Sequence, residues 1–235
     1  MNVRFYDVCV ATGGALFRVL GVRRTVLGLE HVPTEGPFVL AISHFSYLDF
    51  VFVGYPLVKE KSRYARFLGT KASFDHRITG PMMRAGGHIP VDRAAGSHAY
   101  DAAVEALTRG DVVALFPETR VSTSYTLLPF KTGAARMAAE AGVPVVPAVV
   151  WGSHRLLTRG HRSFRRGIPV TVVFGDALLI GGTESDAGTQ ELERVMTRLL
   201  TQAQDDYPER PAPGAWWVPA HRGGGAPAPD DRSHA

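Results

Sequence analysis

Two residues that can transfer protons, His44 and Asp49, lie five positions apart directly after an apolar run. On one continuous helix they would point about 140° away from each other, at ~3.6 residues per turn. They can meet only if His44 lies in a turn and Asp49 lies in the first turns of the helix that follows. Asp49 would then accept the Nδ1 proton of His44 and leave Nε2 free as a general base.

Ser46, three residues before Asp49, favours a helix that begins at this point, because Ser-x-x-acid is a helix-start pattern. The same pattern has a second interpretation, in which Asp49 only caps the helix and His44 is an exposed loop residue. The spacing alone leaves both interpretations open.

The apolar run from Phe38 to Ile42 predicts a short buried strand, and residues 47–58 predict a helix packed against it. His44 therefore follows the end of a strand, where α/β proteins often place their chemistry. Pro147 indicates an edge strand or a bend in its own strand. Further strands are expected over 64–70, 88–91, 111–116, 143–150 and 170–174, and helices over 80–84, 97–109, 130–141 and 191–204. This alternation predicts a single-domain α/β fold with a mostly parallel sheet flanked by helices.

Polar residues recur where the predicted strands end, and the carboxyl ends of parallel strands share one edge of a sheet. A base beside several cations at that edge would suit a substrate with a nucleophilic hydroxyl and a phosphate. Each cation alone is also typical of a solvated surface, and Asp92 with Arg93 would also fit a surface ion pair. The residues in question are His44, Lys71, Arg93, Glu118 and Arg120.

Length and composition limit the possible classes of protein. A chain of 235 residues with 45% hydrophobic and 20% charged residues is typical of one globular domain. The single cysteine, Cys9, excludes an internal disulfide framework and a cysteine-based zinc site. The net charge of +4 comes mostly from arginine and predicts anionic partners, although an arginine-rich solvated surface explains it equally well.

Three regions are expected along the chain. Residues 1–30 predict a helical, membrane-associating segment with arginines at its ends, although a plain packing helix fits as well. Residues 31–207 form the predicted domain, and residues 208–235, rich in Pro, Gly and Ala, predict a disordered tail. Trp216 and Trp217 in that tail are expected to dock on the body or to rest at a lipid interface. No stretch approaches the ~20 apolar residues of a membrane-spanning helix.

Several chemistries lack their motifs. The sequence has no Gly-x-Ser-x-Gly nucleophile elbow, no glycine-rich phosphate loop and no His-Glu-x-x-His helix. The basic cluster at 159–166 would suit an anionic head group or a solvated loop. Nucleic-acid binding is disfavoured, because Phe164 is the only aromatic residue in that cluster.

Four blocks in the same order resemble the glycerolipid acyltransferase family, typified by 1-acylglycerol-3-phosphate acyltransferases. The first is the His-x4-Asp pattern of His44 and Asp49, and the second resembles Gly-His-Ile-Pro-Val-Asp-Arg at 87–93. The third begins with Phe-Pro-Glu at 116–118, and the fourth is Val-Pro-Val-Val-Pro at 143–147.

The resemblance implies transfer of an acyl group from acyl-CoA or acyl-carrier protein to the hydroxyl of a lysophospholipid. His44 would take the hydroxyl proton, Asp49 would orient the imidazole, and no acyl-enzyme would form. Lys71, Arg93 and Glu118 would surround the phosphate and glycerol of the acceptor. No metal or organic cofactor is implied, since acyl-CoA is a co-substrate, and a peripheral or monotopic position on the cytoplasmic face of a membrane is expected.

The third block departs from the family pattern Phe-Pro-Glu-Gly-Thr-Arg-Ser. An ungapped match keeps Ser122 and puts Val121 in the place of the arginine, whereas deleting the glycine keeps Thr119 and Arg120. The residues at 129–136 favour the ungapped match. Thr119, Arg120 and Ser122 are therefore candidate acceptor-binding residues. A glycolipid or another lysolipid remains an alternative acceptor, and a catalytically impaired lipid-binding relative is a further alternative.

Overall fold

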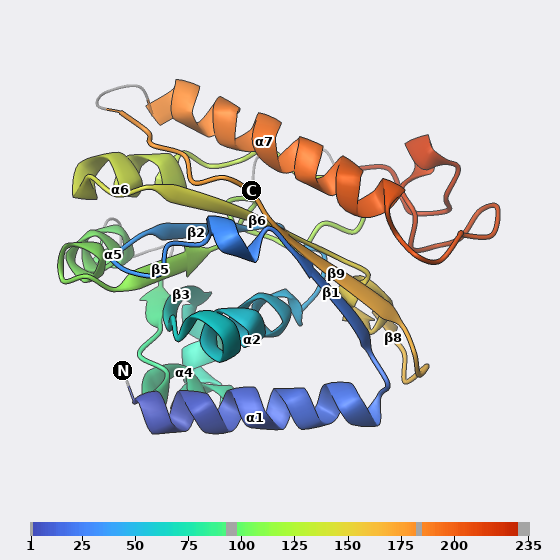
Figure 1. The fold of residues 1–235 in the computed structure, drawn as a ribbon, viewed down its shortest axis with the longest axis horizontal. Coiled ribbons are helices and arrows are strands. Elements are labelled where there is room, and N and C mark those ends of the chain that lie inside the picture. The colour runs from blue at the N-terminus through green and yellow to red at the C-terminus, as the bar shows by residue number, and fades with distance from the viewer. Residues whose placement is uncertain (1, 93–97, 182–184, 230–235) are drawn as a thin grey trace.

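The computed structural model describes residues 2–92, 98–181 and 185–229. Within these ranges seven strands form one sheet in the order β1-β9-β6-β2-β5-β3-β4, and only the β6–β9 pair is antiparallel (Figure 1). A separate hairpin joins β7 (Leu157–Thr158) to β8 (His161–Arg162). The seven strands are β1 (Arg23–Leu27), β2 (Val39–Ile42), β3 (Ala65–Thr70), β4 (Ile89–Val91), β5 (Val112–Leu115), β6 (Val145–Trp151) and β9 (Pro169–Phe174).

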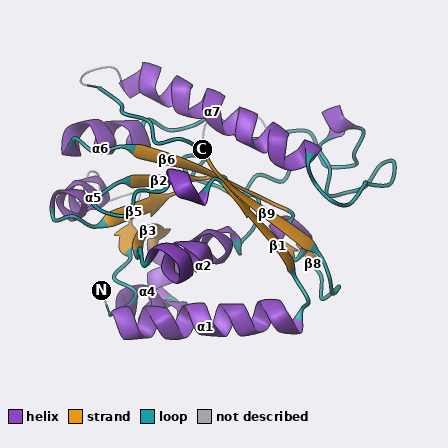
Figure 2. Ribbon diagram, viewed as in Figure 1, coloured by secondary structure: helices purple, strands orange, loops and turns teal. Residues whose placement is uncertain are grey.

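Helices cover both faces of the sheet (Figure 2). On one face lie α5 (His98–Thr108), α6 (Gly133–Ala141) and α7 (Ser185–Asp205), and on the other lie α2 (Asp49–Lys61) and then α1 (Val3–Val19). Two short helices, α3 (Lys71–Asp75) and α4 (Thr79–Ala85), follow β3. The structure confirms the predicted α/β fold with a mostly parallel sheet flanked by helices.

The central strands are buried on both faces, as a parallel sheet between two helical layers requires. In β2, Val39 and Ala41 belong to the core under α5–α7, whereas Leu40 and Ile42 belong to the core under α2. The same alternation holds in β5 and β6. Because successive side chains of a strand point to opposite faces, one run of apolar residues fills both cores.

Pro147 lies in an interior strand, and the expectation of an edge strand was wrong. It is tolerated because the pairing of β6 with the β9 chain is irregular at this point. Regular pairing begins at Ala148 with Phe174, but the bridge before it joins Val145 to Leu178, so the β9 side carries one extra residue. Such a bulge removes the need for an amide hydrogen at the proline.

The predicted helical segment over 1–30 is helical only as far as Val19. Arg23–Leu27 instead forms β1, which pairs in parallel with β9 at one end of the sheet. The strand is short and only partly buried, so its apolar signal is weak. The sheet domain therefore begins before residue 31.

Residues 206–229, named here the C-terminal strap, fold back on the body rather than forming the predicted tail; residues 230–235 lie outside the described residues. The Trp216 ring stacks on the His161 imidazole with 4.1 Å between centroids. Trp217 lies under the Arg155 guanidinium at 4.1 Å, so both tryptophans dock on the body. Val218 and Ala226 of the strap are buried.

Arg155 holds the strap in place. Its side chain is 6% exposed and donates to Glu209 at 2.7 Å and to the Tyr207 hydroxyl at 2.8 Å. A buried cation needs such partners, because an unpaired one would be strongly destabilising. Arg155 thus connects the turn after β6 to the strap.

In the described part of the chain, no helix is both long and apolar enough to cross a membrane.

We expect Arg155→Ala to lower the free energy of unfolding by about 3 kcal/mol, because it leaves Glu209 and Tyr207 without their buried partner. Arg23→Ala is the matched control. Arg23 contacts the same Glu209 at 3.1 Å, but its side chain is 60% exposed, so its loss should cost less than about 1 kcal/mol. Urea unfolding of both variants measures the difference in the free energy of unfolding. Equal losses of stability in the two variants would contradict the role of the buried Arg155 contacts.

Candidate active site

His44 lies in the turn between β2 and α2, and Asp49 is the first residue of α2. The Asp49 carboxylate is fully buried, and its Oδ2 accepts the backbone amides of Phe45 at 2.8 Å and Ser46 at 2.7 Å. The same oxygen lies 3.5 Å from His44 Nδ1. The turn–helix placement inferred from the spacing is therefore present, and Asp49 both caps the turn and faces the imidazole.

The second carboxylate oxygen of Asp49, Oδ1, accepts a hydrogen bond of 2.6 Å from the Ser153 hydroxyl. Burial raises the pKa of Asp49. The hydrogen bond and the charge interaction with His44 lower it, as do the hydrogen bonds from Ser153 and Ser46. These donors replace the water that an ionised carboxylate has lost.

The His44 imidazole is 17% exposed and stacks on the Phe116 ring, with 3.8 Å between centroids and 18° between planes. With Nδ1 facing Asp49, Nε2 is the nitrogen that remains available to a substrate. Phe116 thus supports the ring from one side. The sequence placed Phe116 in a motif but did not predict this contact.

Glu118 lies behind the His44 loop, not at a substrate surface. It is 3% exposed, and its two oxygens accept the backbone amides of His44 at 2.8 Å and Leu128 at 2.9 Å. The prediction that Glu118 lies around the glycerol of the acceptor is therefore corrected: both oxygens are committed to the backbone. Burial raises the pKa of Glu118 to about 8, against the two amides, which lower it.

Ser122 is likewise buried and structural. Its amide donates to the His44 carbonyl at 2.8 Å, and its hydroxyl donates to the Thr126 carbonyl at 2.7 Å. Glu118 and Ser122 together fasten both the N–H and the C=O of His44 to the loop after β5. Ser122 was predicted to contact the acceptor; the structure places it under the loop instead.

Thr119 occupies a backbone conformation that favours glycine, with φ of 59°. It stands where the ungapped match puts the family's glycine, so the structure favours that match over the gapped one. Arg120 then takes the place of the family's threonine and Val121 the place of its arginine. Arg120, Val121 and Arg159 line one small cavity of about 20 Å³ beside this turn.

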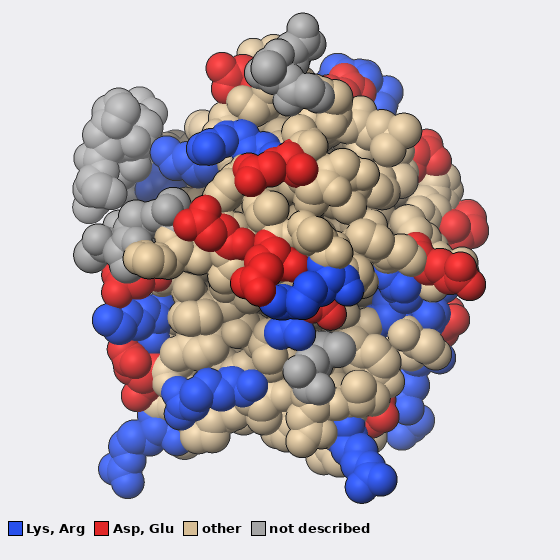
Figure 3. Space-filling view, turned by 90° about the vertical axis from the view of Figure 1, so that its left-hand side faces the viewer, with Lys and Arg blue, Asp and Glu red and all other residues tan. Residues whose placement is uncertain are grey.

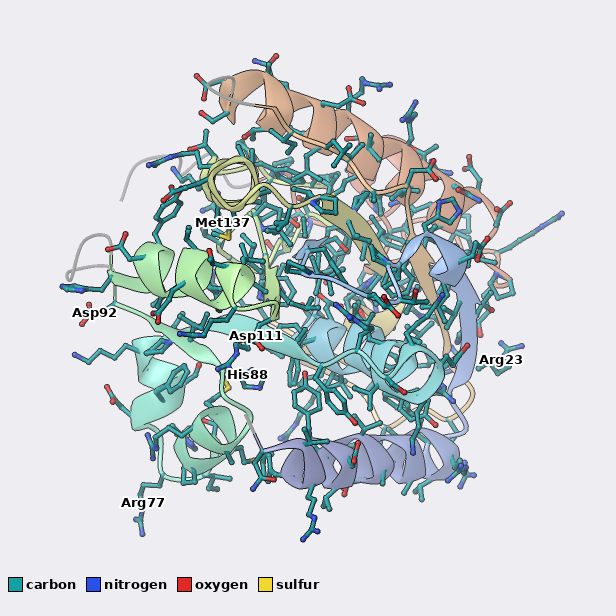
Figure 4. The ribbon with its side chains drawn as sticks, turned by 60° about the vertical axis from the view of Figure 1, so that its left-hand side comes forward. Arg23, Arg77, His88, Asp92, Asp111 and Met137 are labelled. Atoms are coloured by element: carbon teal, nitrogen blue, oxygen red, sulfur yellow. The ribbon has the colours of Figure 1, made fainter. Side chains whose placement is uncertain are left out.

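Lys71 lies apart from the His44 network. It pairs with Asp92 at 3.0 Å and lines a larger cavity of about 560 Å³ at the ends of β3 and β4. Asp92 lies at the outer edge of the molecule and His88 further inside (Figure 4). None of the residues that line this cavity belongs to the His44 hydrogen-bond network. Arg93, the other predicted cation, lies outside the described residues.

Ser153 is the residue of this network that sequence reasoning missed. A signal was present, since Ser153 follows Gly152 directly after a buried strand, on the same edge of the sheet as His44. Among the residues that the structure describes, no group of three or more His, Cys, Asp or Glu side chains could hold a metal ion.

Comparison with known proteins finds similar sequences and a similar fold. Residues 23–151 match the family model described as Acyltransferase. A 1-acyl-sn-glycerol-3-phosphate acyltransferase of Chlamydomonas reinhardtii is 33% identical over 158 residues, which are 66% of this chain and 46% of that protein. The Bacillus subtilis enzyme of that name is 26% identical over 155 residues, 65% of this chain and 72% of that protein.

The chain spans less than half the length of the algal relative and of a chloroplastic relative from Brassica napus. In structure, it resembles the crystal structure of the 1-acyl-sn-glycerophosphate acyltransferase PlsC from Thermotoga maritima. The TM-score is 0.74 at 22% sequence identity, covering 87% of this chain and 81% of that one. At this identity the likeness shows a shared fold.

We expect the pH dependence of stability to reveal the buried Glu118. Its folded-state pKa of about 8 lies above its ordinary value of 4.5, so its contribution is complete below 4.5 and is lost as the pH rises through about 8. Glu118→Gln should cost about 1–3 kcal/mol at pH 5, because an amide cannot accept both backbone N–H groups equally well. The stability gap between wild type and variant should narrow from pH 5 to pH 8.

Urea unfolding at several pH values measures this gap. Glu105→Gln, at a surface position on α5 that is 67% exposed, is the control and should show no narrowing. A gap for Glu118→Gln that stays constant or widens would contradict the buried, protonated carboxyl.

Proposed function

The chain belongs to the Acyltransferase family, and from that premise we propose that it transfers a fatty acyl group from a thioester to the hydroxyl of a lysophospholipid. The proposed acceptor is 1-acylglycerol-3-phosphate, and the product is phosphatidic acid. The observation that carries the proposal is the His44–Asp49 pair, with Nδ1 facing a buried carboxylate and Nε2 free.

In the proposed reaction, Nε2 of His44 takes the proton of the acceptor hydroxyl while the oxygen of that hydroxyl attacks the thioester carbonyl. The new C–O ester bond forms, the C–S bond breaks, and the imidazolium returns its proton to the leaving thiolate. Asp49 stabilises the imidazolium between these steps. General-base assistance of this kind is worth about 10²–10⁴-fold in rate.

The transfer is proposed to be direct, without an acyl-enzyme. The sequence has one cysteine, Cys9, and it lies on α1. The buried hydroxyls near His44 are already engaged: Ser46 donates to the Leu157 carbonyl and Ser153 to Asp49. The base therefore activates the acceptor and not a protein nucleophile.

The acceptor head group is proposed to lie between the turn after β5 and the ends of β3 and β4. Arg120 and Lys71 supply cations there, and the names of the relatives support a glycerol-3-phosphate group. Val121 in place of an arginine is the observation that favours a second candidate acceptor, a lysolipid or glycolipid without a terminal phosphate. The donor is acyl-CoA or acyl-carrier protein.

A membrane surface is proposed as the place of the reaction, because α1 presents an apolar stripe that the body leaves uncovered. Val8, Leu16 and Val19 are 63%, 50% and 64% exposed, while Phe17 and Val10 pack inward. Arg4 and Arg18 are exposed at the two ends of the helix. Basic side chains also project at the lower edge of the face shown in Figure 3, the side on which α1 lies in Figure 1. This combination suits a helix lying in the interface of an anionic bilayer.

We expect thiol release from palmitoyl-CoA to depend on added 1-acylglycerol-3-phosphate, and His44→Ala to reduce the rate at least 10²-fold because the base is lost. The assay uses the detergent-purified chain and is repeated with acyl-carrier protein as donor. His221→Ala is the control, since that imidazole is exposed and lies in the C-terminal strap.

A panel of lysolipids and glycolipids replaces the acceptor in the same assay. Preference for an acceptor without phosphate would support the second candidate. If no donor and acceptor pair gives acyl transfer while the fold is intact, the proposed enzymatic function is rejected. The alternative is then a lipid-binding relative without catalysis.

We expect Leu16→Asp with Val19→Asp to release the protein from anionic phosphatidylglycerol vesicles, because two charges replace the most exposed apolar side chains near the end of α1. Vesicle sedimentation measures the bound fraction. Thr197→Asp with Thr201→Asp adds the same charge to exposed positions of α7 on the opposite side of the sheet, and should reduce binding much less. Equal loss in both variants would show that charge alone, and not the α1 stripe, governs binding.

A further inference from the structure

Ser153 makes the hydrogen bond that completes the surroundings of Asp49. Its hydroxyl donates to Asp49 Oδ1 at 2.6 Å, and both side chains are fully buried. Oδ2, in contrast, accepts two backbone amides and faces His44 Nδ1. The carboxylate therefore has donors on both oxygens, and Ser153 supplies the side-chain donor to the oxygen that points away from the imidazole.

The backbone that carries Ser153 is firmly placed. Ser153–Arg155 forms the 3₁₀ turn η2, entered through Gly152 with φ of 95°. A Cβ at Gly152 would lie 2.3 Å from the Pro169 carbonyl oxygen and 2.7 Å from the Tyr207 hydroxyl, so only glycine fits there.

The next two residues are anchored by the C-terminal strap. His154 Nε2 lies 3.0 Å from the Trp217 carbonyl oxygen, and Arg155 is bonded to Tyr207 and Glu209. Ser153 thus stands on a turn that β9 and the strap hold in place. A side chain on such a turn can hold a partner to the tolerance that proton transfer requires.

The physical consequence of losing this hydroxyl is specific. Oδ1 of Asp49 would become a buried acceptor without its donor, and the carboxylate could rotate away from the plane that serves His44. An ionised carboxylate would also lose a charge-assisted hydrogen bond, which is among the stronger kinds. The family model ends at Trp151, so Ser153 lies outside the residues that it matches.

We propose that Ser153 is a positioning residue of the active site, whose hydroxyl holds the Asp49 carboxylate in the orientation that faces His44. Ser153 acts on the substrate only through Asp49 and His44. The catalytic consequence rests on the proposed function, whereas the hydrogen bond itself does not.

In the acyl-transfer assay, Ser153→Ala is expected to lower kcat about 10- to 100-fold, the range for losing a hydrogen bond to a charged group. KM for both substrates should change little, because no substrate contacts the buried hydroxyl.

A readout independent of activity is the NMR signal of the His44 Nδ1 proton, with histidine labelled with 15N in the full-length chain, because this nitrogen faces Asp49 Oδ2. The chain has nine histidines, and the His44 signal is identified by its loss in His44→Gln. Ser153→Ala should move this signal upfield, because a carboxylate that has rotated away no longer deshields the proton, and Ser153→Cys, with a weaker donor, should fall between Ser153→Ala and the wild type.

Ser43→Ala is the matched control. Ser43 is equally buried and adjoins His44, but its hydroxyl accepts the Val150 amide at 3.0 Å instead of bonding to Asp49. Its His44 Nδ1 proton signal should match the wild type. An unchanged signal in Ser153→Ala, or an equal shift of the signal in Ser43→Ala, would overturn the proposal. If the wild type transfers no acyl group at all, the proposed function fails, and the NMR signal still decides the role of Ser153.

Discussion

A buried carboxylate must be surrounded by donors, and the donors of Asp49 come from separate parts of the chain. The amides of Phe45 and Ser46 come from the turn after β2, and the hydroxyl of Ser153 comes from the turn after β6. These turns meet because β2 and β6 are neighbouring parallel strands, with Ile42 paired to Ala148. Because the buried charge of Asp49 is costly to desolvate, the turn after β2 and the turn after β6 must both lie against its carboxylate. His44, in the turn after β2, is thereby held with Nδ1 facing Asp49.

A second buried carboxyl, Glu118, supports the same loop from the other neighbouring strand. Asp49 faces the His44 ring, whereas Glu118 binds the His44 backbone amide, and Ser122 binds its carbonyl. The negative charge of Asp49 raises the pKa of Glu118, in addition to the larger effect of burial. Two nearby carboxyls whose environments differ in this way can hold different charge states at one pH. Asp49, with more donors and the imidazole, is the one suited to remain charged.

The fold and the pairing of His44 with Asp49 were predictable from local patterns, because the relevant signals lie within a few residues. Alternating strands and helices indicated the sheet. The five-residue spacing and the Ser46–Asp49 helix-start pattern favoured a turn at His44 and a helix that begins near Asp49. The predictions that were wrong involve partners that are distant in sequence. β1 is largely exposed and pairs with a strand about 145 residues later, as its register from Arg23 to Pro169 shows. The bulge that admits Pro147 depends on the β9 chain. Motif membership could not say whether Glu118 faces substrate or backbone.

The strap explains how residues beyond the family match support the turn that carries Ser153. After Trp151 the chain leaves the sheet, and the short 3₁₀ turn η2 that carries Ser153 is followed by the β7–β8 hairpin and not by an α-helix. Buried side chains of that turn then need partners from elsewhere, and the chain after α7 supplies them. Trp217 offers a carbonyl to His154 and a ring to Arg155, and Glu209 neutralises the guanidinium. A segment whose composition indicates disorder is ordered here because one buried cation and one buried imidazole require it. The orientation of Asp49 therefore depends on residues that lie more than 150 positions from it in the sequence.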